Sequence, residues 1–140
     1  MFAAFSEVGC ATISENSNQG STTCEFPGTI QLSTPNPGRI ATDQLVMALG
    51  MNGDLKASRA AAEKAIAADP DYPINYNNLA CADSEKGDAV SAKLHLQQAF
   101  DRRQNVIQGE SMPDPAKDDS ILSLRKNKEF WAFVTSLPRT

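Results

Sequence analysis

From residue 41 onward, apolar side chains recur at intervals of three and four residues, the spacing that places them on one face of a helix. The first run of this kind contains Ala41, Leu45, Ala48 and Leu49. The stretch that follows is rich in alanine, lysine and glutamate, which favour helices. The pattern predicts four successive helices, from residue 41 to the turn before residue 54, and over residues 54–68, 74–85 and 89–103.

Glycine, aspartate and proline separate these predicted helices. Gly53 and Gly87 can adopt the left-handed conformation that ends a helix, and the aspartates that follow them, Asp54 and Asp88, can cap the next one. Pro70 ends the second run because proline disfavours a helical residue before it. The sequence therefore predicts two similar helix–turn–helix units.

Residues 107–140 are expected to form a loop and a C-terminal cap. Pro113 lies in a stretch of glycine and proline that cannot be a helix interior. Beyond it, Asp118 or Asp119 can cap a short helix that carries Ile121, Leu122 and Leu124. A last helix places four apolar residues on one face: Phe130, Phe133, Val134 and Leu137. The aromatic residues there could instead form a binding patch, but their spacing favours burial, with Trp131 as the one that could stay exposed.

Residues 1–40 differ from the rest of the chain in composition. They contain 22 Ser, Thr, Asn, Gln, Gly or Pro residues and only four charged ones. Such a segment offers turn chemistry and little apolar surface. We expect a flexible or irregular N-terminal arm, which leaves residues 41–106 as the two helical units.

The two units repeat each other. A shift of 34 residues places five identities at structural positions, which are Leu45 on Leu79, Ala48 on Ala82, Gly53 on Gly87, Asp54 on Asp88, and Ala65 on Ala99. A helix–turn–helix unit with this period is typical of the tetratricopeptide repeat. Residues 73–106 resemble that family at Tyr76, Asn78, Leu79, Ala80, Gly87, Asp88, Ala92, Leu96 and Ala99. Residues 39–72 resemble it at Leu45, Ala48, Gly53, Ala62, Ala65 and Pro70.

The resemblance implies an all-α fold in which antiparallel helix–turn–helix repeats stack as a short αα superhelix. Small residues would allow the helices to approach closely at Ala48, Ser58, Ala65, Ala82, Ala92 and Ala99. Two positions depart from the family. Ser58 stands where alanine is preferred, and Asp83 stands where a large aromatic residue is usual, so that the helices would pack more loosely there or depend on neighbours.

By the same resemblance, the first helices of both units line a concave groove that binds a peptide or a partner helix. The groove positions would be Asp43, Gln44, Met47, Asn77, Asn78, Cys81 and Glu85. Asn78 is the residue expected to hydrogen-bond a ligand backbone, the alternative being that Asn77 and Asn78 merely solvate the groove. None of these positions is Lys or Arg. A groove of this kind disfavours acidic tails and favours a neutral, mixed apolar or basic segment.

Two other function classes remain as alternatives to a protein-interaction module. Two repeats are fewer than the three or so that a solenoid normally needs, so the chain could be the capping end of a larger assembly or associate with itself. An enzyme would need a reactive constellation, and a Cys81–His95 pair is the sharpest candidate. The resemblance places Cys81 on the groove side and His95 toward the outer face, so no catalytic pair and no cofactor are expected.

Metal sites are not expected either. The chain has three cysteines and one histidine, too few for a usual zinc site. Asp114, Asp118 and Asp119 could bind a hard cation, but they lack the glycine and terminal glutamate of a calcium loop. Helix capping explains these aspartates better.

Charge and cysteine content indicate which classes of partner and which cellular compartment are expected. With 13 Lys and Arg against 17 Asp and Glu, the net charge of −4 argues against nucleic acid and anionic membranes as partners. No apolar run reaches the roughly 18–20 residues of a membrane span, and the N-terminus lacks the basic residues of a secretion signal. An odd number of cysteines suits the reducing cytoplasm. A Cys10–Cys24 bridge in an oxidising compartment remains open.

Overall fold

The computed structural model describes residues 37–139. Within them lie α1 (Pro37–Met51), α2 (Leu55–Ala68), α3 (Pro73–Glu85), α4 (Ala89–Asp101), the 3-10 helix η1 (Arg103–Asn105), α5 (Asp119–Leu122) and α6 (Lys128–Ser136). No residue from 37 to 139 belongs to a β-strand. The predicted all-α class is therefore confirmed for this part of the chain.

The turns within the two helix pairs have the same conformation. Gly53 and Gly87 have positive φ angles of 79° and 80°, in the left-handed region that glycine adopts without strain. Asp54 caps α2 by accepting a hydrogen bond from the backbone N–H of Ala57 at 3.0 Å, and Asp88 caps α4 through Ser91 at 3.0 Å. These local signals are why α1–α2 and α3–α4 each form a helical hairpin.

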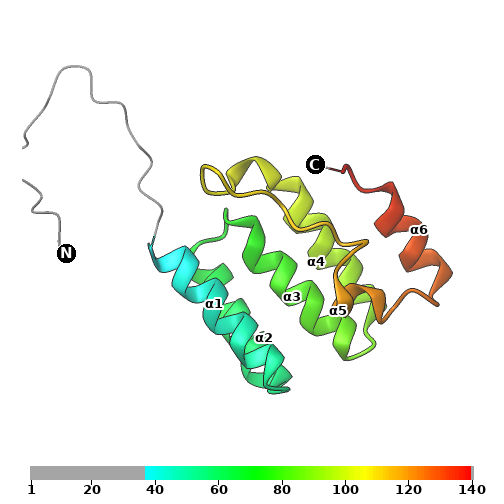
Figure 1. Ribbon diagram of the computed structural model, residues 1–140, viewed down its shortest axis with the longest axis horizontal. Helices are drawn as coiled ribbons and strands as arrows, with labels where there is room; N and C mark the ends of the chain where they lie inside the picture. The colour runs from blue at the N-terminus through cyan, green and yellow to red at the C-terminus, as the bar shows by residue number, and fades with distance from the viewer. Residues whose placement is uncertain (1–36, 140) are drawn as a thin grey trace, which may run out of the picture. The chain divides into compact units, whose positions relative to one another are not determined.

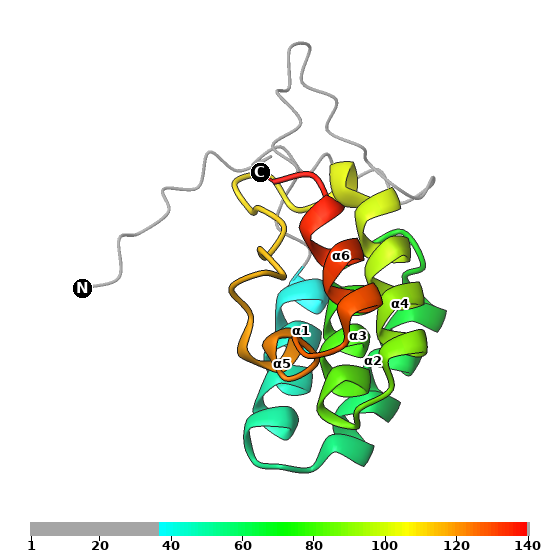
Figure 2. The same ribbon diagram turned by 90° about the vertical axis from the view of Figure 1, so that its right-hand side faces the viewer.

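Helix α3 lies at the centre of the packing. It contacts α1, α2, α4 and α5, as Figures 1 and 2 show for its place between the first hairpin and the C-terminal helices. Eleven of its thirteen residues are buried, among them several polar ones. A helix enclosed in this way cannot show the simple apolar stripe of a surface helix.

Three groups of buried apolar side chains hold the helices together. One joins Val46, Ala62 and Leu79 between the two hairpins. A second surrounds Tyr72, Tyr76 and Phe100, with Met112 and Leu137 from the C-terminal part. The third places Phe130, Val134 and Ile121 against α3 and α4, through Ala80, Ala92 and Leu96. The C-terminal helices thus complete the core of the second hairpin.

The C-terminal part contains the two short helices expected from the sequence, but α5 ends at Leu122, before Leu124, and α6 ends at Ser136, before Leu137. Residues 106–118, hereafter the 106–118 segment, contain no helix. Asp118 caps α5 by accepting hydrogen bonds from the backbone N–H groups of Ser120 at 2.9 Å and Ile121 at 3.2 Å. Phe130 is buried, and Trp131 and Phe133 are half-buried against the same cluster. The aromatic residues of α6 therefore serve mainly as core.

Two expectations about α1 were wrong. Leu45 and Ala48, assigned to packing positions, are exposed, and Val46 is the buried residue of this helix. The equivalent Leu79 and Ala82 are buried because α3 has the first hairpin beside it. Among the described residues no helix precedes α1, so its corresponding face stays open.

Helix α1 also begins at Pro37, four residues before the predicted start at residue 41. Arg39 is therefore part of the helix. Its Nη2 donates a hydrogen bond to Asp69 at 3.0 Å, and its guanidinium lies 4.6 Å from the centre of the Tyr72 ring. The rest of the expected N-terminal arm, residues 1–36, and the Cys10–Cys24 alternative lie outside the described residues.

A buried polar cluster occupies the place where looser packing was expected. Asp83 on α3 is fully buried, with Arg59 of α2 paired to its Oδ1 and Nδ1 of His95 on α4 at 2.6 Å from its Oδ2. The cluster joins three helices by charge and hydrogen bonding instead of aromatic packing. Ser58, the other departure from the repeat pattern, donates to the backbone oxygen of Val46 at 2.9 Å, so its buried hydroxyl is satisfied.

Candidate functional site

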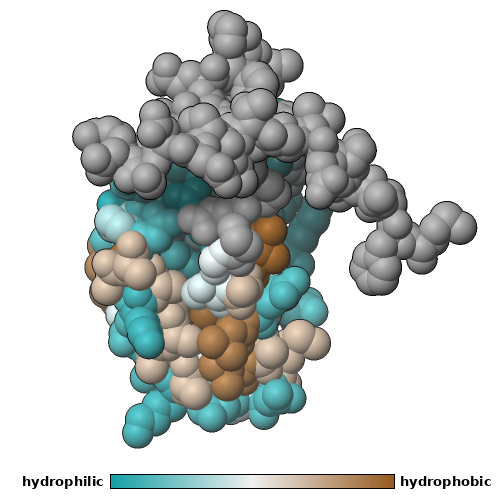
Figure 3. Space-filling view, turned by 90° about the vertical axis from the view of Figure 1, so that its left-hand side faces the viewer, coloured by the Kyte–Doolittle hydropathy of each residue, from teal (hydrophilic) through white to brown (hydrophobic). Residues whose placement is uncertain are grey.

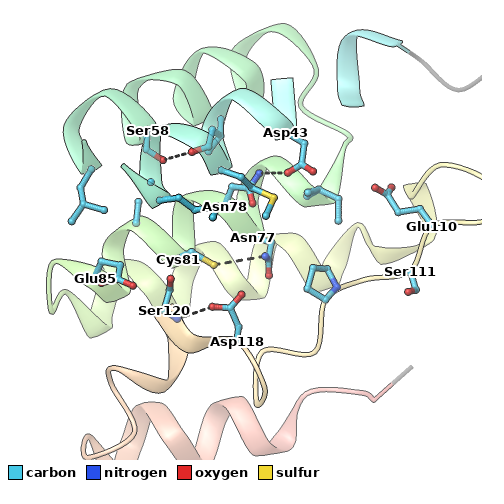
Figure 4. A pocket seen from close by; sticks show the side chains of 18 residues that line it. Asp43, Ser58, Asn77, Asn78, Cys81, Glu85, Glu110, Ser111, Asp118 and Ser120 are labelled. Atoms are coloured by element: carbon cyan, nitrogen blue, oxygen red, sulfur yellow. Dashed lines mark hydrogen bonds between the residues drawn. The ribbon is translucent and has the colours of Figure 1, made fainter. Parts of the chain in front are cut away.

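A hollow of about 370 Å³ opens between α1, the start of α2 and α3 on one side and the 106–118 segment with the start of α5 on the other (Figure 4). It is larger than a second hollow, of about 10 Å³, which is lined by Phe100, Pro113 and Leu137 among others. Its lining consists of Asp43, Val46, Met47, Gly50, Met51, Leu55, Ser58, Ile74, Asn77, Asn78, Cys81, Ala82, Glu85, Glu110, Ser111, Pro113, Asp118 and Ser120.

The structure brings together six of the seven residues that the sequence assigned to a groove. They are Asp43, Met47, Asn77, Asn78, Cys81 and Glu85. Gln44 is exposed and does not line the hollow. The grouping of the others follows from helix geometry, since side chains three and four residues apart share a face.

The hollow's polar walls are fixed in place by hydrogen bonds across elements. The Nδ2 of Asn78 donates to Oδ1 of Asp43 at 2.6 Å, which joins α3 to α1. The donor expected to meet a ligand backbone is therefore engaged with a carboxylate of the protein. The same bond holds the Asp43 carboxylate beside Asn78 at the wall of the hollow (Figure 4).

Sequence reasoning missed the wall that the C-terminal part contributes. Five lining residues come from it: Glu110, Ser111, Pro113, Asp118 and Ser120. Repeat periodicity ends before this segment, so it carried no signal for where the chain would run. The tyrosine and glutamate that anchor it, Tyr72 and Glu110, are far apart in sequence, and the Tyr72 hydroxyl donates to Glu110 at 2.8 Å.

Negative charge dominates the polar lining. Four carboxylates face or rim the hollow: Asp43, Glu85, Glu110 and Asp118. None of the residues that line it in the described chain is Lys, Arg or His. The charge argument made from the sequence positions is thus reinforced by two further carboxylates, Glu110 and Asp118.

Cys81 lines the hollow as a neutral thiol. Burial, and then the nearby Asp118 carboxylate, raise the pKa of Cys81 well above its usual range. A thiol that stays protonated is a poor nucleophile. Nδ1 of His95 lies 2.6 Å from Oδ2 of Asp83 in the buried cluster, whereas the sulfur of Cys81 accepts from Nδ2 of Asn77 at 3.8 Å and lines the hollow.

Asp114 and Asp118 each accept hydrogen bonds from backbone N–H groups of their own segment. Asp114 accepts a hydrogen bond from the backbone N–H of Ala116 at 3.0 Å, and Asp118 caps α5. Across residues 37–139, no three potential ligands among His, Cys, Asp and Glu are grouped to hold a metal ion. No helix in that range has the length and apolar character needed to cross a bilayer.

Comparisons with protein-family models, with curated proteins and with solved structures gave no match for this chain. Functional inference therefore depends on the hollow itself. Its shape is concave, its walls combine apolar and acidic side chains, and three of its four carboxylates accept hydrogen bonds from neutral donors. These properties suit the binding of a neutral or positively charged group with apolar neighbours.

Proposed function

We propose that this chain is a non-catalytic protein-interaction module, a scaffold or adaptor of the tetratricopeptide type, that holds a peptide or helix of a partner protein in the hollow. The observation that carries the proposal is that six side chains assigned to a groove from the sequence line one hollow. The volume of about 370 Å³ falls within the range of about 300–1,000 Å³ typical of ligand sites.

The lining supports a segment with both apolar and polar contacts. Val46, Met47, Leu55 and Ile74 provide apolar surface, while Asp43 and its neighbours provide hydrogen-bond acceptors. Methionine adapts its shape to different apolar partners. An acidic peptide would bring like charges together at the four carboxylates, and such juxtaposition disfavours binding.

The test uses peptides selected from a random display library on the purified full chain. We expect enriched peptides to bind with a dissociation constant of roughly 1–100 μM in calorimetric titration. Met47→Arg should abolish this binding, because it places a long cationic side chain in the hollow. Val90→Arg is the matched control, since Val90 is an exposed apolar residue on α4 outside the hollow.

Surface substitutions of this kind usually change stability by no more than about 0.5 kcal/mol. Both variants are therefore expected to fold, and melting curves verify it. If the selected peptides bind Met47→Arg and the unsubstituted chain equally well, the hollow is not where they bind. A library that yields no binding peptide would also contradict the proposal.

A second candidate function, self-association or the capping of a larger helical-repeat assembly, is favoured by the open face of α1. Apolar side chains gather on the side formed by α1 and α2 (Figure 3). One side of α1, hereafter the α1 face, carries Ala41, Leu45 and Ala48, which are all exposed and lie at the three- and four-residue spacing of a single helix face. Exposed apolar patches of this type commonly mark interaction surfaces.

Sedimentation at increasing protein concentration tests this candidate. If a second copy covers the α1 face, Leu45→Arg should keep the chain monomeric where the unsubstituted protein associates. Leu94→Arg on α4 is the control, because the two leucines are 53% and 55% exposed. A monomer at all concentrations for the unsubstituted chain would rule self-association out.

A further inference from the structure

Three of the four carboxylates of the hollow, those of Asp43, Glu110 and Asp118, accept hydrogen bonds from neutral groups of the protein. Asp43 receives the amide of Asn78 at 2.6 Å. Asp118 receives two backbone N–H groups at the start of α5, at 2.9 and 3.2 Å. These bonds fix the positions of the oxygens but cancel none of their charge.

Glu110 is held in the same manner from the opposite wall. Its Oε1 accepts the hydroxyl of Tyr72 at 2.8 Å, and its Oε2 accepts the backbone N–H of Ile107 at 3.1 Å. Glu110 and Asp118 come from the 106–118 segment, Asp43 comes from α1, and Glu85 ends α3 (Figure 4). Carboxylates prearranged on several sides of one hollow spare a cationic ligand part of the cost of ordering them.

A separate observation also indicates a missing hydrogen-bond donor. Asn77 is only 4% exposed and lines the hollow, with its Nδ2 directed at the sulfur of Cys81 at 3.8 Å. Its side-chain oxygen has no hydrogen-bond partner among the described residues. A buried acceptor without a donor destabilises the protein, so a ligand that brings a donor to the Asn77 oxygen is favoured.

The apolar lining suits the stem of a long cationic side chain. Val46, Met47 and Ile74 lie on the side of α1 and α3, next to the carboxylates. Arginine and lysine both bury their methylene groups along apolar surface while their charged ends remain with polar groups. The guanidinium has five donors in a rigid plane and is more weakly hydrated than an ammonium group, so it matches several acceptors in a half-enclosed site better.

We propose that the hollow recognises an arginine side chain in a segment of the partner protein, with carboxylates and the oxygen of Asn77 accepting from its guanidinium. This inference rests on the proposed function and adds the chemistry that selects the partner. The peptide backbone remains at the opening of the hollow, and the arginine side chain enters it. No cation of the described lining competes for the carboxylates.

The test follows the backbone N–H signals of the full chain by nuclear magnetic resonance during titration with small blocked amino acids. The probe is Nα-acetyl-arginine-N-methylamide, and its control is the citrulline analogue, which has the same shape without the charge. We expect arginine to bind about tenfold or more tightly than citrulline, the effect of hydrogen bonds to a charged group. Shifts should centre on Asn77, Asn78 and Cys81.

Three carboxylate variants locate the charge effect. Asp43→Asn and Asp118→Asn should each weaken the arginine probe several-fold and leave the citrulline analogue unchanged. Asparagine also caps helices, so Asp118→Asn keeps α5 capped. Asp101→Asn is the control, because Asp101 is an exposed carboxylate on α4 outside the hollow.

Two further titrations test whether the guanidinium comes from a protein segment or from free arginine, and whether an ammonium group can replace it. Free arginine should bind more weakly than the blocked probe, because its own carboxylate is repelled by the hollow. Tighter binding of free arginine would overturn the partner-segment proposal in favour of a small-molecule site. A lysine analogue that binds as tightly as arginine would overturn the choice of guanidinium.

Failure of this inference differs from failure of the proposed function. If arginine and citrulline bind equally, or neither shifts the signals of the hollow, arginine recognition is refuted. The proposed function would still be supported if library peptides without basic residues bind the unsubstituted chain and do not bind Met47→Arg. If arginine and citrulline bind equally, and the library peptides also bind Met47→Arg as well as they bind the unsubstituted chain, both proposals are refuted.

Discussion

Removing the guanidinium of Arg59 tests how much the buried polar cluster contributes to stability. The Asp83 side chain is 1% exposed, and its carboxylate lies between the guanidinium and the ring of His95. Arg59→Met keeps a long apolar stem and removes the charge. Breaking a buried ion pair typically costs about 3–5 kcal/mol, because the remaining charge is left without compensation.

The structure places the expected loss near the lower end of this range. The Arg59 side chain is 28% exposed, so solvent screens part of its interaction with Asp83. We expect Arg59→Met to lower the free energy of unfolding by about 3 kcal/mol, a large part of the roughly 5–15 kcal/mol of a small domain. Urea unfolding followed by circular dichroism measures this difference.

The free energy of unfolding lost in Arg59→Met should depend on pH, because His95 in the same cluster can take up a proton. Burial, and then the charge of Arg59, lower the pKa of His95 from its usual 6.5. Arg59→Met removes the second of these causes, so the pKa of His95 in the folded state moves up toward that of the unfolded state. A histidine pKa held below the unfolded value costs stability as pH falls through the unfolded pKa, and the variant loses part of this cost. Arg59→Met should therefore cost less at about pH 5.5 than at about pH 8.

An exposed ion pair provides the matched control. Lys93 on α4 pairs with Glu129 on α6 at 3.1 Å, and the two side chains are 43% and 85% exposed, more than those of Arg59 and Asp83. Lys93→Met removes a cation in the same way and should cost less than about 1 kcal/mol. If Arg59→Met costs no more than this control at either pH, the buried cluster does not stabilise the fold as argued.

Three further predictions concern the ends of the helical core. Phe130→Ala should cost about 3–5 kcal/mol and lower the melting temperature sharply, and an unchanged melting curve would mean that Phe130 is not core. Arg39 holds the pKa of Asp69 below its usual 3.8, so this carboxylate stabilises the fold above that pH and stops doing so as pH falls. Asp69→Asn should accordingly lessen the fall in stability between about pH 6 and pH 3 seen in urea titrations. Deleting residues 1–36 should leave the melting temperature nearly unchanged, while deleting residues 1–40 should lower it through loss of Arg39.

The helices could be predicted from the sequence because their signals are local. Gly53 and Gly87 mark the turns, the aspartates after them cap the next helices, and apolar spacing marks the faces between. These signals act over a few residues, and the structure reproduces them. Local pattern does not say which face of a helix has a neighbour, and for this reason Leu45 was assigned to the core although no described helix covers it.

The hollow was only half predictable for a similar reason. Its α1 and α3 walls follow the repeat, so Asp43, Asn77 and Asn78 could be assigned by position. Its other wall depends on where an irregular segment runs, which is fixed by contacts such as that of Tyr72 with Glu110. For the buried cluster, Asp83 in place of an aromatic residue indicated a charged partner, since a buried carboxylate needs one. No spacing rule identified Arg59 as that partner.

Helix α3 is enclosed by α1, α2, α4 and α5, and this enclosure bears on how the protein opens. Regions with many buried neighbours open only when most of the structure does, whereas peripheral elements open locally at lower free energy. The backbone amides of α3 should therefore exchange with solvent deuterium last, and those at the start of α1 and the end of α6 first. A ligand bound against α3 would then contact a wall that stays folded during local opening. The 106–118 segment forms the opposite wall, and its local opening would give the ligand access to the hollow.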